Sequence, residues 1–167
     1  VSDRDRVQLD AEGSIQYGMY YWDDNYPDSH VFAEGECLRK TFDPDFMLYH
    51  TMAVDEWGHM KGADSAEYAN AVAAVGHLIA ARMPEWLEKG YQVVVTADHG
   101  MNNLGIHVGT EHAQREVALY IFSDKVENGR FEENYISQLN VAPMVCRLMG
   151  VPATEGMKQE LEIAFAK

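Results

Sequence analysis

The segment Tyr91–Gly100, YQVVVTADHG, joins an apolar run to a polar end. Its first part, Tyr91–Thr96, has the length and composition typical of a strand buried on both faces. Asp98 and His99 follow this run directly, and Gly100 gives the backbone room to turn sharply. The stretch therefore predicts a core strand whose C-terminal end carries a carboxylate and an imidazole.

A second strand with a similar ending is predicted upstream. Phe46–Met52, FMLYHTM, is a continuous apolar run of strand length, and Asp55 and His59 follow it. Ligands of open α/β sheets bind outside the carboxyl ends of the strands. The four-residue spacing places Asp55 and His59 on one face of a helical turn, where both could reach a single cation. Alone, each pattern is common in solvated turns, but together they favour a metal site.

The rest of the chain alternates between strand and helix patterns. We predict further strands at Ile15–Trp22 and Glu116–Phe122, and helices at His30–Lys40, from Asp64 to about Trp86, at Ser137–Met149 and at Gly156–Phe165. Such alternation implies right-handed crossovers between parallel strands. We therefore expect an α/β fold, with a mostly parallel sheet covered by helices on both faces, in a single domain over residues 1–167.

The candidate ligands indicate which metals would bind. Carboxylates and imidazoles without thiolates suit zinc, manganese or iron better than calcium or magnesium. His107 and His112 lie in the loop after Asp98 and offer further imidazoles. Two cations about 4 Å apart can stabilise both the attacking and the leaving oxygen of a phosphoryl displacement.

Composition limits the partners. The formal net charge of −14 argues against binding to nucleic-acid polymers or anionic membranes, because phosphate contacts need Lys and Arg. A small phosphorylated substrate remains compatible, with bound metal as the positive centre. No apolar run approaches the ~20 residues needed to cross a bilayer. Cys37 and Cys146 do not suggest a disulfide framework, so a cytoplasmic setting is expected.

Four stretches carry a resemblance to a known family. Val95–Met101, VTADHGM, resembles the signature of the alkaline phosphatase superfamily. Pro44–Gly62 is similar to the stretch in which type I phosphodiesterases carry another Asp-x-x-x-His pair. Gly105–Phe122 resembles the loop that brings the last metal-binding His, and Asn140–Pro152 the helix that closes the sheet. The resemblance runs from about Phe42 to Pro152, and its motifs are specific jointly.

The resemblance implies a two-metal site, with two divalent ions that are zinc or, as an alternative, manganese. Asp55 and His59 would bind the first metal together with a third His, and Asp98 and His99 would bind the second. His107 matches the third ligand in relatives with a Gly-x-His-Gly-Gly loop. His112 matches it where the ligand lies nearer the next strand.

We favour His107, although Val108 stands where a Gly is frequent in the family.

The resemblance also implies a function. We expect a metal-dependent hydrolase of phosphate esters, acting on phosphodiester or nucleotide pyrophosphate bonds. The alternatives are a phosphomonoesterase, phosphoglycerate mutase, phosphonate hydrolase or phosphoethanolamine transferase, or a non-catalytic metal-binding domain. In this family a Thr or Ser nucleophile precedes the Asp-x-x-x-His pair, and the first forty residues show no match. We therefore expect the C-terminal portion of a larger catalytic domain, without its nucleophile.

Overall fold

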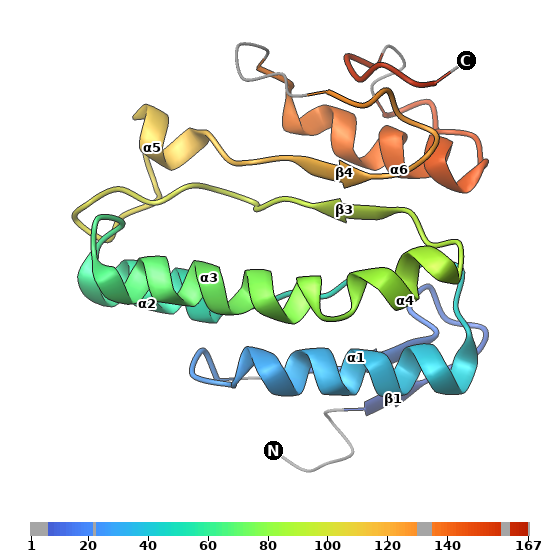
Figure 1. Cartoon of the computed structure of the whole chain (residues 1–167), viewed down its shortest axis with the longest axis horizontal. Helices are drawn as coiled ribbons and strands as arrows, with labels where there is room; N and C mark the ends of the chain where they lie inside the picture. Colours follow the sequence, from blue (N-terminus) through green and yellow to red (C-terminus); the bar gives the residue numbers. More distant parts are fainter. Residues whose placement is uncertain (1–6, 22, 130–134, 158–160, 167) are drawn as a thin grey trace. The chain divides into compact units, whose positions relative to one another are not determined.

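The computed structural model describes residues 7–21, 23–129, 135–157 and 161–166. The chain divides into two compact units, here called unit 1 and unit 2 (Figure 1). Unit 1 comprises Val1–Arg82 and Ala97–Val117, and unit 2 comprises Met83–Thr96 and Ala118–Lys167. The assignment of residues 1–167 to one domain stays a prediction.

Unit 1 is mainly helical. Its elements are β1 (Val7–Leu9), β2 (Tyr17–Met19), α1 (Asp28–Phe42), α2 (Ala53–Lys61), α3 (Ala66–Ala80) and α5 (His112–Arg115). β1 and β2 pair antiparallel, and α3 packs against both α1 and α2 (Figure 1). The side chains of Phe32, Leu38, Ala71 and Met101 are buried in this unit. The core of unit 1 therefore lies between helices, which present apolar residues at helical spacing.

The predicted strand Phe46–Met52 is wrong. Residues 46–52 belong to no strand or helix. The side chains of Phe46 and Leu48 are 55% and 78% exposed. A strand is stable only when its backbone groups pair with a neighbouring strand. Within the part of unit 1 that is described, β1 and β2 pair with each other and no ladder includes residues 46–52.

The single long helix expected from Asp64 to Trp86 is two helices. α3 ends at Ala80, and α4 (Met83–Glu88) belongs to unit 2. Pro84 falls in the first turn of α4, where a missing N–H group costs nothing. The N-cap of α3 is Ser65, one residue after the expected start at Asp64, and its hydroxyl accepts a hydrogen bond from the Tyr68 amide.

Unit 2 is built on one short sheet. β3 (Val93–Val95) pairs with β4 (Tyr120–Phe122), so that Val94 lies opposite Ile121. α6 (Val141–Met149) follows the 3₁₀ turn η2 (Gln138–Asn140) and buries Met144 and Leu148. These two side chains form a core with Ile163, against which residues of both strands pack.

The α/β class is consistent with these elements, but the mostly parallel sheet is not confirmed. Both sheets among the described residues have two strands, and both are antiparallel. A parallel sheet needs a further strand in the same direction as β3. The segment expected to supply it, Phe46–Met52, forms no ladder in the described part of the chain.

The C-terminal region departs from expectation in a similar way. Of the helix predicted over Gly156–Phe165, residues 158–160 lie outside the described residues, and the others are not helical. Phe165 instead forms an isolated antiparallel bridge with Val126. No helix in the described ranges is long and apolar enough to span a bilayer. Cys37 and Cys146 are free thiols, and the cytoplasmic setting stays a prediction.

Candidate metal centre

Helix α2 brings the first two predicted ligands together. Asp55 and His59 lie one turn apart, and Nε2 of His59 is 3.4 Å from Oδ2 of Asp55. Gly58, buried on the same helix, packs against Met101, and a Cβ atom at this position would come within 2.8 Å of the Met101 methyl carbon. The helix therefore sits close to the loop that begins at Ala97.

That loop supplies the next pair of predicted ligands. Nε2 of His99 lies 3.8 Å from Oδ1 of Asp55 and 3.6 Å from Oδ2 of Asp98. Nδ1 of His99 lies 3.1 Å from the Gly100 carbonyl oxygen. An Nδ1–H group bonded to this oxygen would leave Nε2 with its lone pair towards the carboxylates.

His107 completes the cluster. Its ring stacks on that of His99, with the centroids 3.8 Å apart, and meets the ring of His59 edge-on at 4.9 Å. One ligand atom from each of Asp55, His99 and His107 lies within 4.8 Å of the other two. Five predicted ligands thus lie in one region of unit 1, namely Asp55, His59, Asp98, His99 and His107.

The three-residue group mixes residues that the resemblance assigns to different metals. Asp55 and His107 are expected on the first ion, whereas His99 is expected on the second. Two ions in such sites are only ~4 Å apart, so ligands of both ions share one small volume. The geometry is therefore compatible with one ion held by the group or with two ions held by the larger cluster.

His112, the alternative third ligand, lies elsewhere. It begins the short helix α5, its side chain is 90% exposed, and its Nδ1 atom contacts the Glu116 carboxylate. That contact involves no other predicted ligand. Among the two candidates, the structure places only His107 beside Asp55 and His99. Metal binding by His107 itself stays a prediction.

Two buried side-chain amides, which the sequence did not single out, form hydrogen bonds to the backbone of the loop that carries His107. Oδ1 of Asn102 accepts hydrogen bonds from the amides of Leu104 and Ile106, at 3.0 and 2.9 Å. Nε2 of Gln114, on α5, donates to the Ile106 carbonyl at 3.2 Å. Both side chains are buried, where lost hydrogen bonds are costly. The local signal, a polar residue inside a glycine-rich loop, does not distinguish such amides from exposed ones.

Gly105 allows this loop to lie against α2. Its φ angle is +73°, and a Cβ atom would come within 2.6 Å of the His59 carbonyl oxygen. Its own carbonyl oxygen lies 2.8 Å from Nδ1 of His59 and can accept a hydrogen bond from it. The same residue thus gives the close approach and orients a predicted ligand.

We expect Gly105→Ala to lower the free energy of unfolding by at least about 1 kcal/mol, because alanine resists a left-handed backbone. It should also weaken metal binding. Urea denaturation and zinc titration measure the two effects. Gly76→Ala is the matched control: Gly76 lies in α3, its Cβ would meet nothing within 4 Å, and alanine there should stabilise the helix. Equal effects of the two substitutions would contradict the role assigned to Gly105.

The electrostatics of the cluster suit a cation. Oδ1 of Asp55 is buried and has no hydrogen-bond partner among the described residues. Burial and the Asp55 carboxylate raise the pKa of the Tyr68 hydroxyl. Burial, followed by the carboxylates of Asp28, Asp24 and Asp98, raises the pKa of Tyr21. Because unpaired carboxylates are costly to bury, the arrangement fits a bound divalent ion.

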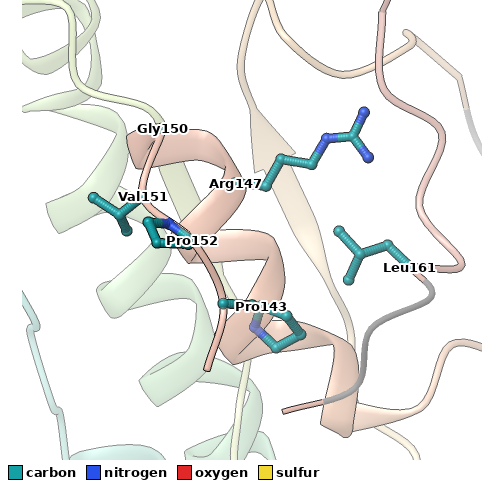
Figure 2. Close-up of a pocket in the computed structure, with 7 residues that line it drawn as sticks. Pro143, Arg147, Gly150, Val151, Pro152 and Leu161 are labelled. Carbon is teal, nitrogen blue, oxygen red and sulfur yellow. The ribbon is translucent and has the colours of Figure 1, made fainter. Parts of the chain in front are cut away.

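Unit 2 contains a hollow of a different character (Figure 2). It lies beside the C-terminal part of α6 and the turn that follows, and its lining residues are Pro143, Arg147, Gly150, Val151, Pro152, Ala153 and Leu161. These side chains include no carboxylate or imidazole. The Arg147 guanidinium lies 3.9 Å from the centroid of the Phe165 ring. The hollow therefore does not resemble a metal site.

Comparison with known families agrees with the candidate site. The family described as type I phosphodiesterase / nucleotide pyrophosphatase matches residues 14–142. The chain belongs to this family. The match includes every candidate ligand, and the resemblance to the alkaline phosphatase superfamily is confirmed. The description of the family names two activities, on phosphodiester bonds and on nucleotide pyrophosphate bonds.

The names of curated relatives are more specific than the description of the family. The catalytic subunit of GPI ethanolamine phosphate transferase 3 from Mus musculus is 27% identical over 157 residues, which cover 89% of this chain and 14% of that protein. The Homo sapiens protein of the same name is 29% identical over 115 residues, covering 67% and 10%. GPI ethanolamine phosphate transferase 2 from Schizosaccharomyces pombe is 24% identical over 132 residues, covering 67% and 17%.

The chain thus spans between 10% and 17% of the length of these three relatives. No solved structure gives a significant match. Membership of the type I phosphodiesterase family is established, but a hydrolase activity is not confirmed. The relatives are named as transferases, which agrees better with the phosphoethanolamine transferase that was one of the alternatives.

Proposed function

We propose that this chain supplies the metal ligands of an enzyme that acts on phosphoester bonds, and that the enzyme transfers ethanolamine phosphate to an alcohol. The metal centre rests on one observation, the cluster of Asp and His side chains around Asp55. The choice of transfer over hydrolysis rests on the names of the relatives. Both parts are proposals about a whole protein, because the chain spans only 10% to 17% of the length of the three relatives.

The donor set supports two divalent ions, and zinc is the first choice. In our assignment Asp55, His59 and His107 bind one ion, and Asp98 and His99 bind the other. Imidazole and carboxylate ligands without sulfur suit zinc, with manganese as the alternative. The carbonyl oxygen of Gly105 fixes His59 in the orientation that such ligands usually have.

Each part of the chain would have a separate task in the reaction. The bound metal would offer positive charge to the phosphoryl oxygens of a substrate. Helix α2 would hold Asp55 and His59 in place, and the loop organised by Asn102 would hold His99 and His107. The attacking nucleophile is assigned to no residue of this chain.

The proposal can be tested with chromogenic diesters and the whole protein that contains this chain. p-Nitrophenyl phosphoethanolamine and p-nitrophenyl thymidine monophosphate would be compared in the presence of zinc and of a chelator. We expect turnover of the first substrate to exceed that of the second, and the chelator to abolish it. Zinc-dependent turnover of the thymidine diester alone would instead favour a nucleotide pyrophosphatase activity.

The fate of the phosphoryl group separates transfer from hydrolysis. Hydrolysis is a second candidate because the family description names a phosphodiesterase and a pyrophosphatase. With an alcohol such as glycerol present, a transferase should give the ethanolamine phosphate ester of that alcohol. Mass spectrometry would detect it. Release of p-nitrophenol with free ethanolamine phosphate as the only ethanolamine-containing product would support the hydrolase, and metal binding without any turnover would support a non-catalytic domain.

A further inference from the structure

Asp28 is a buried acidic residue outside the ligand cluster. It is the first residue of α1, and only 7% of its surface is exposed. Its Oδ1 atom accepts hydrogen bonds from the backbone amides of Met52 and Ala53, at 3.1 and 3.4 Å. Those amides are 24 and 25 residues away along the chain, so the contact joins two separate elements of unit 1.

The two amides belong to the start of α2. Met52 is the N-cap of that helix and Ala53 its first residue, and the N-cap makes no side-chain hydrogen bond of its own. The first amides of a helix lack intrahelical partners and need an acceptor from elsewhere. Asp28 therefore supplies from α1 the cap that Met52 cannot provide, and its negative charge also suits the helix N-terminus.

The capped turn carries Asp55. Oδ1 of Asp55 is buried and has no hydrogen-bond partner in the described residues. No donor in the described part of the chain fixes this oxygen, and the position of the helix backbone decides how near it lies to His99. A shift of the first turn of α2 would move the carboxylate directly.

Keeping Asp28 in place is costly for the fold. Oδ2 of Asp28 is buried and has no hydrogen-bond partner among the described residues. Leaving that oxygen without a hydrogen bond costs about 1–3 kcal/mol, which offsets part of the stabilisation that the two amide hydrogen bonds contribute. An exposed Ser or Asn cap at the same helix start would avoid that cost.

We propose that Asp28 is a positioning residue for the metal centre. By capping α2 from α1, it holds the turn that carries Asp55 at the distance from His99 and His107 that a shared cation requires. This inference rests on the proposed metal-binding function. It adds that the affinity for the metal depends on a residue that contributes no ligand atom.

The test compares zinc affinity in three variants of this chain, measured by competition with a chromogenic chelator. We expect Asp28→Ala to weaken zinc binding about tenfold, the size of effect known for outer partners of metal ligands. Asp28→Asn retains an acceptor oxygen and should restore most of the affinity. Ser65→Ala is the control at the other end of α2: it removes the N-cap hydrogen bond of α3, a helix without predicted ligands, and the hydrogen bond from the Ser65 hydroxyl to the carbonyl oxygen of Gly62, the C-cap of α2.

Ser65→Ala should lower the stability by about 1 kcal/mol and leave zinc affinity unchanged. Zinc affinity that is equal in Asp28→Ala and the unaltered chain would overturn the inference. An equal loss in Ser65→Ala would also overturn it, because the effect would then follow general destabilisation. Circular dichroism would establish that all three variants are folded at the temperature of the titration.

A second readout does not depend on metal. Amide hydrogen exchange at Met52 and Ala53 should accelerate in Asp28→Ala and not in Ser65→Ala. If the unaltered chain binds no zinc, the proposed function of this chain fails. Faster exchange would then still support the positioning of the turn by Asp28, whereas unchanged exchange would overturn it.

Discussion

Replacing Asp55 with alanine is expected to reduce zinc affinity by more than about 100-fold, because changes in outer partners alone typically cost 10- to 100-fold. Asp55 is the only carboxylate in the three-residue group with His99 and His107. Without it, the two imidazoles lack the negative charge that balances a divalent ion. Isothermal titration calorimetry and elemental analysis of the purified chain would measure the loss.

The same substitution should have a different effect on the metal-free protein. Oδ1 of Asp55 is buried without a hydrogen-bond partner among the described residues, which is unfavourable by about 1–3 kcal/mol for such a group. We therefore expect metal-free Asp55→Ala to unfold at the same or a higher temperature than the parent. Loss of affinity together with lower stability would instead indicate that Asp55 has a structural role.

Glu67→Ala is the control for charge. Glu67 is an exposed carboxylate in the first turn of α3, so the substitution removes one negative charge from the same unit. Zinc affinity should change by less than about twofold, because an exposed charge is screened by solvent. An equal loss of affinity in both variants would show that zinc responds to net charge rather than to a ligand.

The second large effect is expected from His107. His107→Ala removes the ring that stacks on His99 and meets His59, and zinc affinity should again fall by about 100-fold or more, above the range for outer partners. His112→Ala should leave the affinity nearly unchanged, since that side chain is exposed and contacts Glu116. Both variants replace a histidine with alanine, so any difference in zinc affinity between them reflects the position of the histidine.

The opposite order would identify His112 as the ligand. It would also require the loop between His107 and α5 to rearrange when metal binds. Losing the hydrogen bond from Gln114 to Ile106 would be part of that change. Nuclear magnetic resonance of the two imidazoles during a zinc titration would show directly which ring responds.

Several features of the site follow from local sequence. Asp55 and His59 share a face because residues four apart on a helix are neighbours, and the structure places both on α2. The run Val93–Val95 forms a strand because β-branched residues fit an extended, half-buried backbone. α6 matches its amphipathic pattern and ends at Gly150, which adopts a left-handed conformation. Each of these depends on a few neighbouring residues.

Other features could not be predicted from local sequence. Phe46–Met52 has the composition of a strand, yet a strand also needs a partner, and sequence does not show whether one is present. The direction of β3 relative to β4 is likewise a property of the pair. Pro84 predicts a kink or an end of the helix near this point, but α3 already ends at Ala80, before Pro84, which lies in the first turn of the separate helix α4.

By itself the sequence determined the type I phosphodiesterase family, the identity of the candidate ligands and the helical spacing of Asp55 and His59. Only the tertiary structure separated His107 from His112, revealed the amides of Asn102 and Gln114 that hold the loop, and connected Asp28 to the start of α2. The physical reason is the range of the interactions. Motif spacing and helix periodicity are set within a few residues, whereas caps and ring contacts join residues that are distant along the chain.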